Sequence, residues 1–245
     1  MRRHLLIRLK GPLQAWGDVA LDPRRPTRDF PSRSALAGLM ASALGWEYRD
    51  AERTTALQDE LRYAVREDRR PLRIRDFQTV DLGRESTGWT RWGIERRGGS
   101  ASEGTHILRK DFLADGSLLV AATIGAGAPA GLDEIASALR YPARPLFLGR
   151  RCCPPSTPLF EGLIDAESPY AALTSAPLDP AAGSSNDRYR CWYDPDDAPP
   201  VSPDQYSGDM GEEIWDRRDF LTNRFTGSRR VVVAWLDPAL MRRAG

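Results

Sequence analysis

The feature that most restricts the fold of this chain is the order of strand-like and helix-like segments over residues 1–150. These segments follow one another as β, α, β, β, α, β, and one long insertion interrupts them. The strand-like segments are residues 4–10, 63–66, 72–80 and 118–124, and a last strand is expected just before Gly149. The order is typical of the split βαβ unit of ferredoxin-like (RRM-like) domains, so we predict an α+β fold built on such a unit.

Three helices are predicted from apolar residues that recur every three or four positions. The first begins at Ser32 or Ser34, since either hydroxyl suits an N-cap, and ends at Gly45, a residue typical of helix C-termini. Its apolar face consists of Leu36, Leu39, Met40, Ala43 and Leu44. The other two helices are expected over residues 51–61 and 131–139.

The insertion, residues 81–105, differs in composition from its surroundings. It carries six glycines, two tryptophans (Trp89 and Trp92) and four arginines (Arg84, Arg91, Arg96 and Arg97), with no apolar periodicity. A stretch this long without regular structure is uncommon inside a compact domain unless it is functional or disordered. We interpret it as an arm that becomes ordered on RNA or on a protein partner.

The C-terminal part, residues 151–245, has a weaker pattern than the N-terminal part. Residues 152–205 contain many prolines and the acidic tract 194–197, and only residues 229–236 (RRVVVAWL) form a strong strand pattern. We therefore predict two domains: residues 1–150, which include the insertion, and residues 151–245, a smaller and loop-rich β subdomain.

The charge distribution points to an anionic partner, although the net charge is only +1. Residues 1–110 carry 22 basic and 15 acidic side chains, whereas residues 111–245 carry 13 and 19. Of the 35 basic residues, all but Lys10 and Lys110 are arginine. Codon usage in a GC-rich genome explains such an excess as well as phosphate recognition by guanidinium groups does, so the asymmetry is the stronger signal.

Common enzyme signatures are missing from the sequence. It contains no phosphate-binding loop, no dinucleotide fingerprint, no HExxH and no GxSxG, and the spacing of Cys152, Cys153 and Cys191 suits neither zinc nor a disulfide framework. We expect no metal and no cofactor. The cysteine usage fits a reducing cytoplasm, and no segment is apolar enough to predict a membrane span. His4 is interpreted as structural, whereas His106 could contact RNA or act as a base.

Two basic segments are candidate phosphate sites. Residues 24–34 (RRPTRDFPSRS) lead into the first helix, whose N-terminal N–H groups would attract an anion. Arg150 and Arg151 follow Gly149 at the expected end of a strand. Ahead of the first segment, Gln14 and Trp16 lie on a loop between Gly11 and Gly17, where they could read and stack unpaired bases. Each of these features could also be ordinary surface charge or core.

Several sequence blocks together resemble one protein family. They are GPLQAWG at 11–17, RPT at 25–27, FPSRSALAGL at 30–39, DFQTV at 76–80, KDFLAD at 110–115 and FLGRR at 147–151, followed by Cys153-Pro154. The first and third blocks are the most specific, and the resemblance covers residues 1–160. The chain thereby resembles the CasD subunits of type I-E CRISPR Cascade, which belong to the RAMP superfamily.

This resemblance implies a ferredoxin-like domain with a long β-hairpin thumb, here at about residues 81–110. It implies a non-catalytic, cytoplasmic subunit that holds the 5′ handle of the CRISPR RNA (crRNA), contacts the Cascade backbone subunit and the large subunit, and so takes part indirectly in DNA targeting. A related branch in type I-C systems instead cleaves precursor crRNA without a metal, and this is the alternative. The RNA contacts implied are Gln14, Trp16, Arg25, Thr27, Ser32, Arg33, Ser34, His106, Arg109, Lys110, Arg150 and Arg151.

Overall fold

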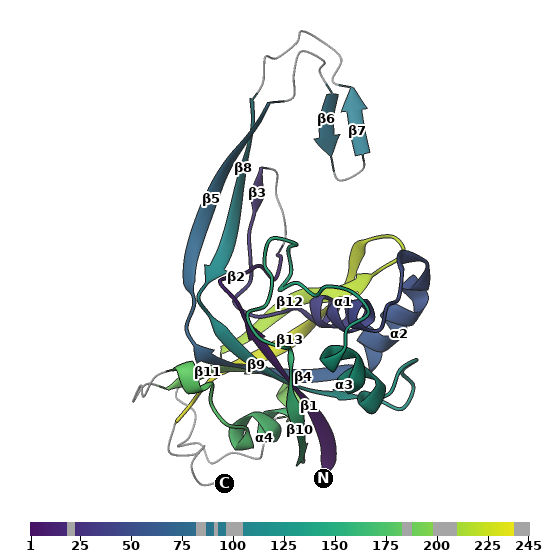
Figure 1. The fold of residues 1–245 in the computed structure, drawn as a ribbon, viewed down its shortest axis with the longest axis vertical. Coiled ribbons are helices and arrows are strands. Elements are labelled where there is room, and N and C mark those ends of the chain that lie inside the picture. The colour runs from purple at the N-terminus through teal and green to yellow at the C-terminus, as the bar shows by residue number, and fades with distance from the viewer. Residues whose placement is uncertain are drawn as a thin grey trace.

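The computed structural model describes residues 1–18, 23–81, 87–90, 93–96, 105–182, 188–197 and 210–237. Its centre is a seven-stranded sheet in the order β10-β1-β9-β4-β11-β13-β12, and every neighbouring pair is antiparallel. The strands are β1 (Arg2–Lys10), β4 (Leu61–Arg69), β9 (Ser117–Ile124), β10 (Phe160–Ala166), β11 (Tyr189–Tyr193), β12 (Met210–Asp219) and β13 (Arg224–Leu236). The α+β class predicted from the sequence is confirmed (Figure 1).

Three helices cover one face of this sheet: α1 (Arg33–Ala43), α2 (Ala51–Glu60) and α3 (Leu132–Arg140). Their apolar sides pack on alternate residues of the central strands, such as Leu5, Ile7 and Leu9 of β1. Ser32 caps α1, since its hydroxyl accepts a hydrogen bond from the backbone N–H of Ala35 at 3.1 Å. Gly45 follows with a φ of +79°, a conformation that favours glycine. The three predicted helices are therefore confirmed.

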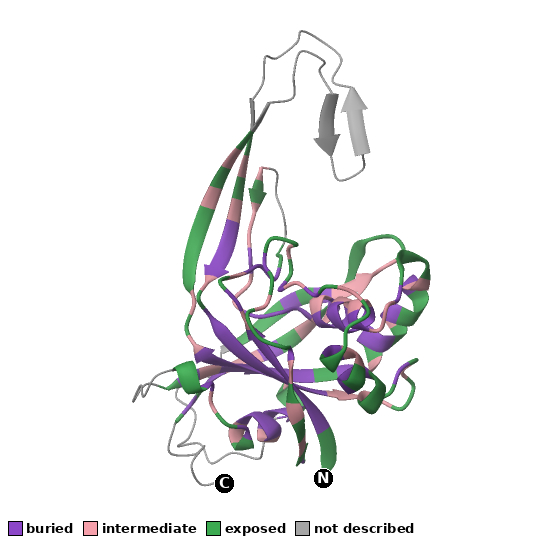
Figure 2. Ribbon diagram, viewed as in Figure 1, coloured by how far each residue is buried: buried purple, intermediate pink, exposed green. Residues whose placement is uncertain are grey.

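The opposite face of the sheet is covered by α4 (Pro169–Ser175), a helix that the sequence pattern did not indicate. It packs on the side chains that β1, β4 and β9 direct away from α1–α3, among them Leu6, Ala64 and Leu119. The central strands are thus buried on both faces, and Figure 2 shows the middle of the sheet as mostly buried. Short 3₁₀ helices occur at Tyr48–Asp50, Pro180–Ala182 and Pro195–Asp197.

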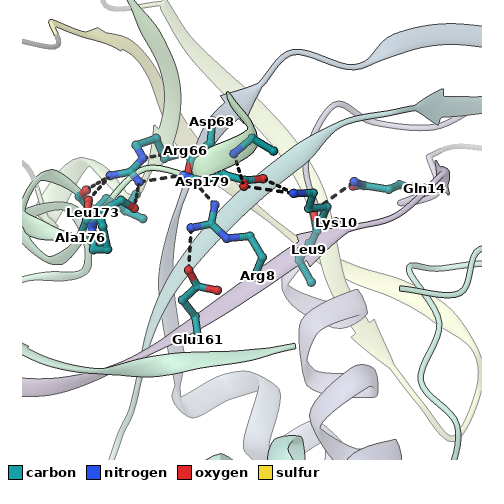
Figure 3. A network of polar contacts seen from close by, with 12 residues as sticks. Arg8, Leu9, Lys10, Gln14, Arg66, Asp68, Glu161, Leu173, Ala176 and Asp179 are labelled. Atoms are coloured by element: carbon teal, nitrogen blue, oxygen red, sulfur yellow. Dashed lines mark hydrogen bonds and ion pairs between the residues drawn. The ribbon is translucent and has the colours of Figure 1, made fainter. Parts of the chain in front are cut away.

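A buried polar network holds α4 against the sheet (Figure 3). Arg66 of β4 is 0% exposed and donates to the carbonyl oxygens of Leu173, Ala176 (2.9 Å) and Pro177 (2.8 Å) at the C-terminal end of α4. Its Nε donates to the carboxylate of Asp68 at 2.5 Å. Arg66 thereby satisfies backbone carbonyls that a helix C-terminus leaves without intrahelical partners.

The same network continues to β1 and to the segment after α4. The second oxygen of Asp68 accepts from Arg8 Nη1 at 2.5 Å and from the backbone N–H of Asp179 at 2.9 Å. Asp179 in turn pairs with Lys10 at 2.9 Å, and Glu161 accepts from Arg8 at 3.1 Å. The network therefore joins β1, β4, β10 and the segment that follows α4.

Asp179 makes the stability of this region dependent on acid pH. Burial by itself raises the pKa of its carboxyl, but hydrogen bonds from the Ala181 N–H and from Lys10 outweigh burial and lower the pKa to about 2. Because the folded pKa lies below the unfolded value of about 3.9, the stabilisation is present above about pH 4 and is lost as the pH falls towards 2. We expect Asp179→Asn to flatten the acid limb of a Tm-versus-pH curve. An unchanged acid limb would contradict this assignment.

A second, smaller sheet projects from the body as a stem (Figure 1). Its strands β5 (Leu72–Asp81) and β8 (Thr105–Ala114) pair along their whole length, and β2 (Leu13–Gln14) and β3 (Arg24–Arg25) lie on the other edge of β8. The backbone beyond the stem contains one more antiparallel pair, β6 (Thr87–Thr90) and β7 (Gly93–Arg96). The β5–β8 pairing thus runs from Leu72 and Ala114 to Asp81 and Thr105, so it starts outside the predicted thumb at 81–110.

The strand expected just before Gly149 is not present. Residues 143–148 lack regular structure, and the corresponding strand of the sheet is β10, further along the chain. Leu148 is buried, but its backbone bonds to Ala15 (2.9 Å) and Cys153 (2.7 Å) rather than to a strand of the sheet. The apolar residues that resembled a strand therefore pack a loop against the 11–17 segment.

The C-terminal part contains more regular structure than predicted. The strand expected at 229–236 is confirmed as part of β13, but β10, β11 and β12 were not indicated by the sequence. β11, β13 and β12 continue the same sheet beyond β4. The division into residues 1–150 and 151–245 stays a prediction.

Candidate nucleic-acid interface

One face of the stem gathers arginine and aromatic side chains. Cross-strand pairs in an antiparallel sheet lie on the same face, and the register pairs Arg75 with Asp111, Phe77 with Arg109 and Thr79 with Ile107. Arg24 of β3 lies opposite Arg109 on the other edge of β8. We call Arg24, Arg75, Phe77, Ile107 and Arg109 the stem face.

The stem face carries a net positive charge, and one buried aspartate holds two of its arginine side chains in position. Asp111 is 1% exposed and accepts from Arg75 at 2.7 Å and from Arg24 at 3.2 Å. The hydrogen bond from Arg75, followed by that from Arg24, lowers the pKa of Asp111. The carboxylate therefore remains charged and orients two guanidinium groups, each still about half exposed.

The same face offers a surface on which a base can stack. Phe77 is 56% exposed, and the guanidinium carbon of Arg109 lies 6.0 Å from the centre of its ring. An exposed aromatic ring beside arginines is the combination that proteins use to bind single-stranded nucleic acid, because bases stack on the ring and phosphates pair with the cations. The arrangement can therefore bind RNA without reading its sequence.

Lys110 and Arg25 lie at neighbouring register positions on the other face of the stem. Lys110 Nζ donates to Oε1 of Gln78 at 2.6 Å, and Gln78 in turn donates to Asp76 at 2.6 Å. This face is more nearly neutral than the stem face, because Asp76 lies beside its two cations. It is a weaker candidate for phosphate binding.

Arg150 braces the root of the stem. It donates to the carbonyl oxygens of Asp111 and Arg25, both at 2.9 Å, and its guanidinium lies 4.7 Å from the ring centre of Phe112. Burial lowers its pKa. Arg150 therefore positions β3 against β8, whereas its neighbour Arg151 is exposed to solvent.

Gln14, Trp16 and Thr27 lie in the interior rather than on a binding surface. Gln14 is 1% exposed, donates to the carbonyl oxygens of Leu9 and Gly116, and accepts from the indole N–H of Trp16 at 3.1 Å. The hydroxyl of Thr27 accepts from the backbone N–H of Trp16 at 2.8 Å. These hydrogen bonds hold the loops that carry β2 and β3, and direct contact of the three residues with RNA stays a prediction.

At the start of α1, where a phosphate site was predicted, a backbone N–H group is engaged by an acidic side chain of the protein. The carboxylate of Asp216, which is 1% exposed, accepts from the backbone N–H of Arg33 at 2.9 Å and pairs with Arg229 at 3.0 Å. The side chain of Arg33 pairs with Asp194 at 3.4 Å. Ser32 and Ser34 are buried, with their hydroxyls 3.1 Å apart. An acidic residue of β12 thus occupies the helix end at which a phosphate was predicted, and RNA contact by Ser32, Arg33 and Ser34 stays a prediction.

Of the two histidines, the structure describes the side chain of His4 only. His4 is fully buried, as expected for a structural residue, and burial lowers its pKa. The backbone of His106 belongs to β8, but its side chain lies outside the described residues. No group of three or more His, Cys, Asp or Glu side chains among the described residues is placed to bind a metal.

Sequence reasoning missed several residues of the stem. Arg73, Arg75 and Phe77 alternate along LRIRDFQTV, and this period of two would have placed them on one face of a strand. Asp111 was quoted only as part of a block, although its pairing with Arg24 and Arg75 organises the face. No local signal linked Arg24 to these residues, because β3 reaches β8 through a long-range parallel pairing.

The chain matches known proteins along nearly its whole length. Residues 4–232 match the family described as CRISPR-associated protein (Cas_Cas5). A protein of Escherichia coli (strain K12), "CRISPR system Cascade subunit CasD", is 36% identical over 181 residues, which is 71% of this chain and 76% of that protein.

Two solved structures resemble the fold. A chain of a "CRISPR RNA-guided surveillance complex" is 27% identical with a TM-score of 0.67, and the match covers 97% of this chain and 92% of that chain. A "Crystal structure of Cas protein" is 26% identical with a TM-score of 0.62 and covers 97% and 96%. In the described part of the chain no helix has the length and apolar character needed to cross a bilayer.

Proposed function

Because this chain belongs to the Cas5 family of CRISPR-associated proteins, we propose that it binds crRNA as a non-catalytic subunit of a Cascade surveillance complex. The observation that carries the proposal is the stem face, where three arginines and an exposed phenylalanine form one positively charged, stackable surface. The similarity to the Escherichia coli Cascade subunit and to a chain of a CRISPR RNA-guided surveillance complex supports the role of a structural subunit.

The ferredoxin-like unit is part of this proposal. β1, β4, β9 and β10 are neighbours in the order β10-β1-β9-β4, with α1 and α2 between β1 and β4 and α3 between β9 and β10. This layout supports the predicted split βαβ unit, and the stem is inserted between β4 and β9, where the thumb would lie. Through the thumb the chain would hold the 5′ handle of the crRNA between the backbone subunit and the large subunit. The free thiols of its cysteines fit the cytoplasm.

The experiment that tests this proposal uses the purified full chain and RNA of its own CRISPR repeat. We expect a saturable shift in fluorescence anisotropy on mixing the chain with handle RNA, and precursor repeat RNA that stays intact after incubation in EDTA. Absence of binding would contradict the RNA-binding role. Specific cleavage that disappears in His106→Ala would instead support the endonuclease of the type I-C branch.

A further inference from the structure

A polar cleft of about 590 Å³ opens at the root of the stem, where β4 passes into β5. Its charged lining comes from three separate parts of the chain: Asp29 before α1, Glu67 and Arg70 at the end of β4 with Arg73 of β5, and Arg190 of β11. Pro71, Leu72 and Leu113 form an apolar wall. None of the residues predicted to bind RNA lines this cleft.

Glu67 is the unusual member of this lining. It is 8% exposed, and within the described residues its carboxylate has no hydrogen bond and no ion pair. Burial raises the pKa of Glu67, an effect that Arg190 and Arg70 partly offset and that Asp29 increases. A buried carboxylate normally has hydrogen-bond donors, so Glu67 lines the cleft with acceptor capacity that the protein leaves unused.

The arginines of the cleft are arranged by a different acid. Asp29 accepts from Arg73 at 2.5 Å and from Arg190 at 2.9 Å, and Arg190 also lies 4.6 Å from the ring centre of Trp192. Arg70 is exposed to solvent. With three arginines and two acids, the cleft is positive by one charge, which disfavours a lysine or arginine of a protein partner as the donor to Glu67. A neutral donor carried on an anionic backbone suits the cleft better.

We infer that the cleft binds a guanine base of the RNA, with the Glu67 carboxylate accepting from the adjacent N1–H and N2–H₂ groups of guanine. Guanine is the RNA base that presents two neighbouring donors on its Watson–Crick edge. Adenine, cytosine and uracil each place a ring or carbonyl acceptor beside their donor, and that acceptor would face the carboxylate. The arginines supply donors for the guanine O6 and N7 atoms and for the phosphate.

This inference rests on the proposed function, because Arg73 places the cleft next to the stem face along β5. Arg73 pairs in register with Leu113 and lies two residues before Arg75, so it occupies the same side of β5 as the stem face. A single strand that follows Arg109, Phe77 and Arg75 towards the body would reach the cleft next. The stem face would supply affinity and the cleft would supply preference for one base.

The test measures the affinity of the full chain for two short uridine-rich RNAs that differ at one position, guanosine or adenosine. We expect wild type to prefer the guanosine RNA by about tenfold, since a good bidentate base contact contributes about 1–3 kcal/mol. In Glu67→Gln the preference should fall below about twofold, while binding of the adenosine RNA is retained. Glutamine has nearly the same shape as glutamate and carries no buried charge, so the variant is expected to fold.

The matched control is Glu134→Gln, the same substitution at an exposed position of α3 outside the cleft, which should keep the preference. Equal binding of both RNAs by wild type, or a preference that survives in Glu67→Gln, would overturn the inference and leave the proposed function standing. If wild type binds neither RNA, the proposed function itself fails.

Discussion

Replacing Arg66 by methionine is expected to reduce the free energy of unfolding by about 3–5 kcal/mol, as measured by urea denaturation. The guanidinium is fully buried and bonds to three carbonyl oxygens at the end of α4 and to Asp68. Methionine fills a similar volume but donates no hydrogen bond. The variant therefore leaves one buried carboxylate without its main partner and several helix-end carbonyls without donors.

A double substitution separates the lost ion pair from lost packing. Asp68→Leu removes the carboxylate that Arg66→Met leaves behind, so the double variant should be more stable than the sum of the two single effects predicts, by about 1–3 kcal/mol. Full recovery is not expected, because Asp68 also binds Arg8 and the backbone N–H of Asp179. Strict additivity would show that the two side chains act independently.

The control for Arg66 is an ion pair of the same type on the surface. Arg3 pairs with Asp133 at 3.0 Å, and both side chains are more than half exposed. Arg3→Ala should change stability by less than about 1 kcal/mol. If Arg66→Met also reduced the free energy of unfolding by less than about 1 kcal/mol, this would contradict the view that the network holds α4 on the sheet.

The sequence predicted those elements whose signals are local. Ser32 and Gly45 bracket α1 because a hydroxyl cap and a left-handed glycine are short-range requirements of a helix. β1, β9 and β13 have long apolar patterns, which follows from burial on at least one face of the sheet. β10 was missed because the apolar residues of FEGLIDA do not alternate with polar ones: the adjacent Leu163 and Ile164 lie on opposite faces of this edge strand, and Leu163 is exposed.

The candidate site was harder to predict because residues far away in the sequence determine which arginines form ion pairs within the protein and which stay exposed. Arg33 and Arg109 are equivalent in the sequence analysis, since the family resemblance implies both as RNA contacts. In the fold, Asp194 and Asp216 come from 161 and 183 residues away to engage Arg33, whereas Arg109 stays exposed beside Phe77. Composition and spacing cannot reveal such pairings, since they depend on which strands become neighbours. The excess of basic residues in the N-terminal part therefore includes structural arginines as well as those that we propose bind RNA.

If the exposed arginines bind RNA, as we propose, their removal should have a large effect on RNA binding. We expect Arg109→Ala combined with Arg151→Ala to weaken handle binding about a hundredfold at low salt, because each lost charge-assisted contact contributes about 1.5 kcal/mol. Both side chains are exposed, and Arg151 adjoins the Arg150 brace that joins β3 to β8. Anisotropy titrations over a range of salt concentrations measure the affinity and its salt dependence together.

The salt dependence distinguishes phosphate contacts from loss of net charge. For single strands the slope of log K against log salt changes by about 0.7 for each phosphate neutralised, so the double variant should lower the magnitude of the slope by about 1.4. Arg3→Ala combined with Arg217→Ala removes the same formal charge from exposed ion pairs with Asp133 and Asp59, and it should leave the slope unchanged. Arg33→Ala should also preserve the slope, because its guanidinium already neutralises Asp194. Equal slopes in wild type and in the Arg109 and Arg151 double variant would show that RNA follows another surface of the protein.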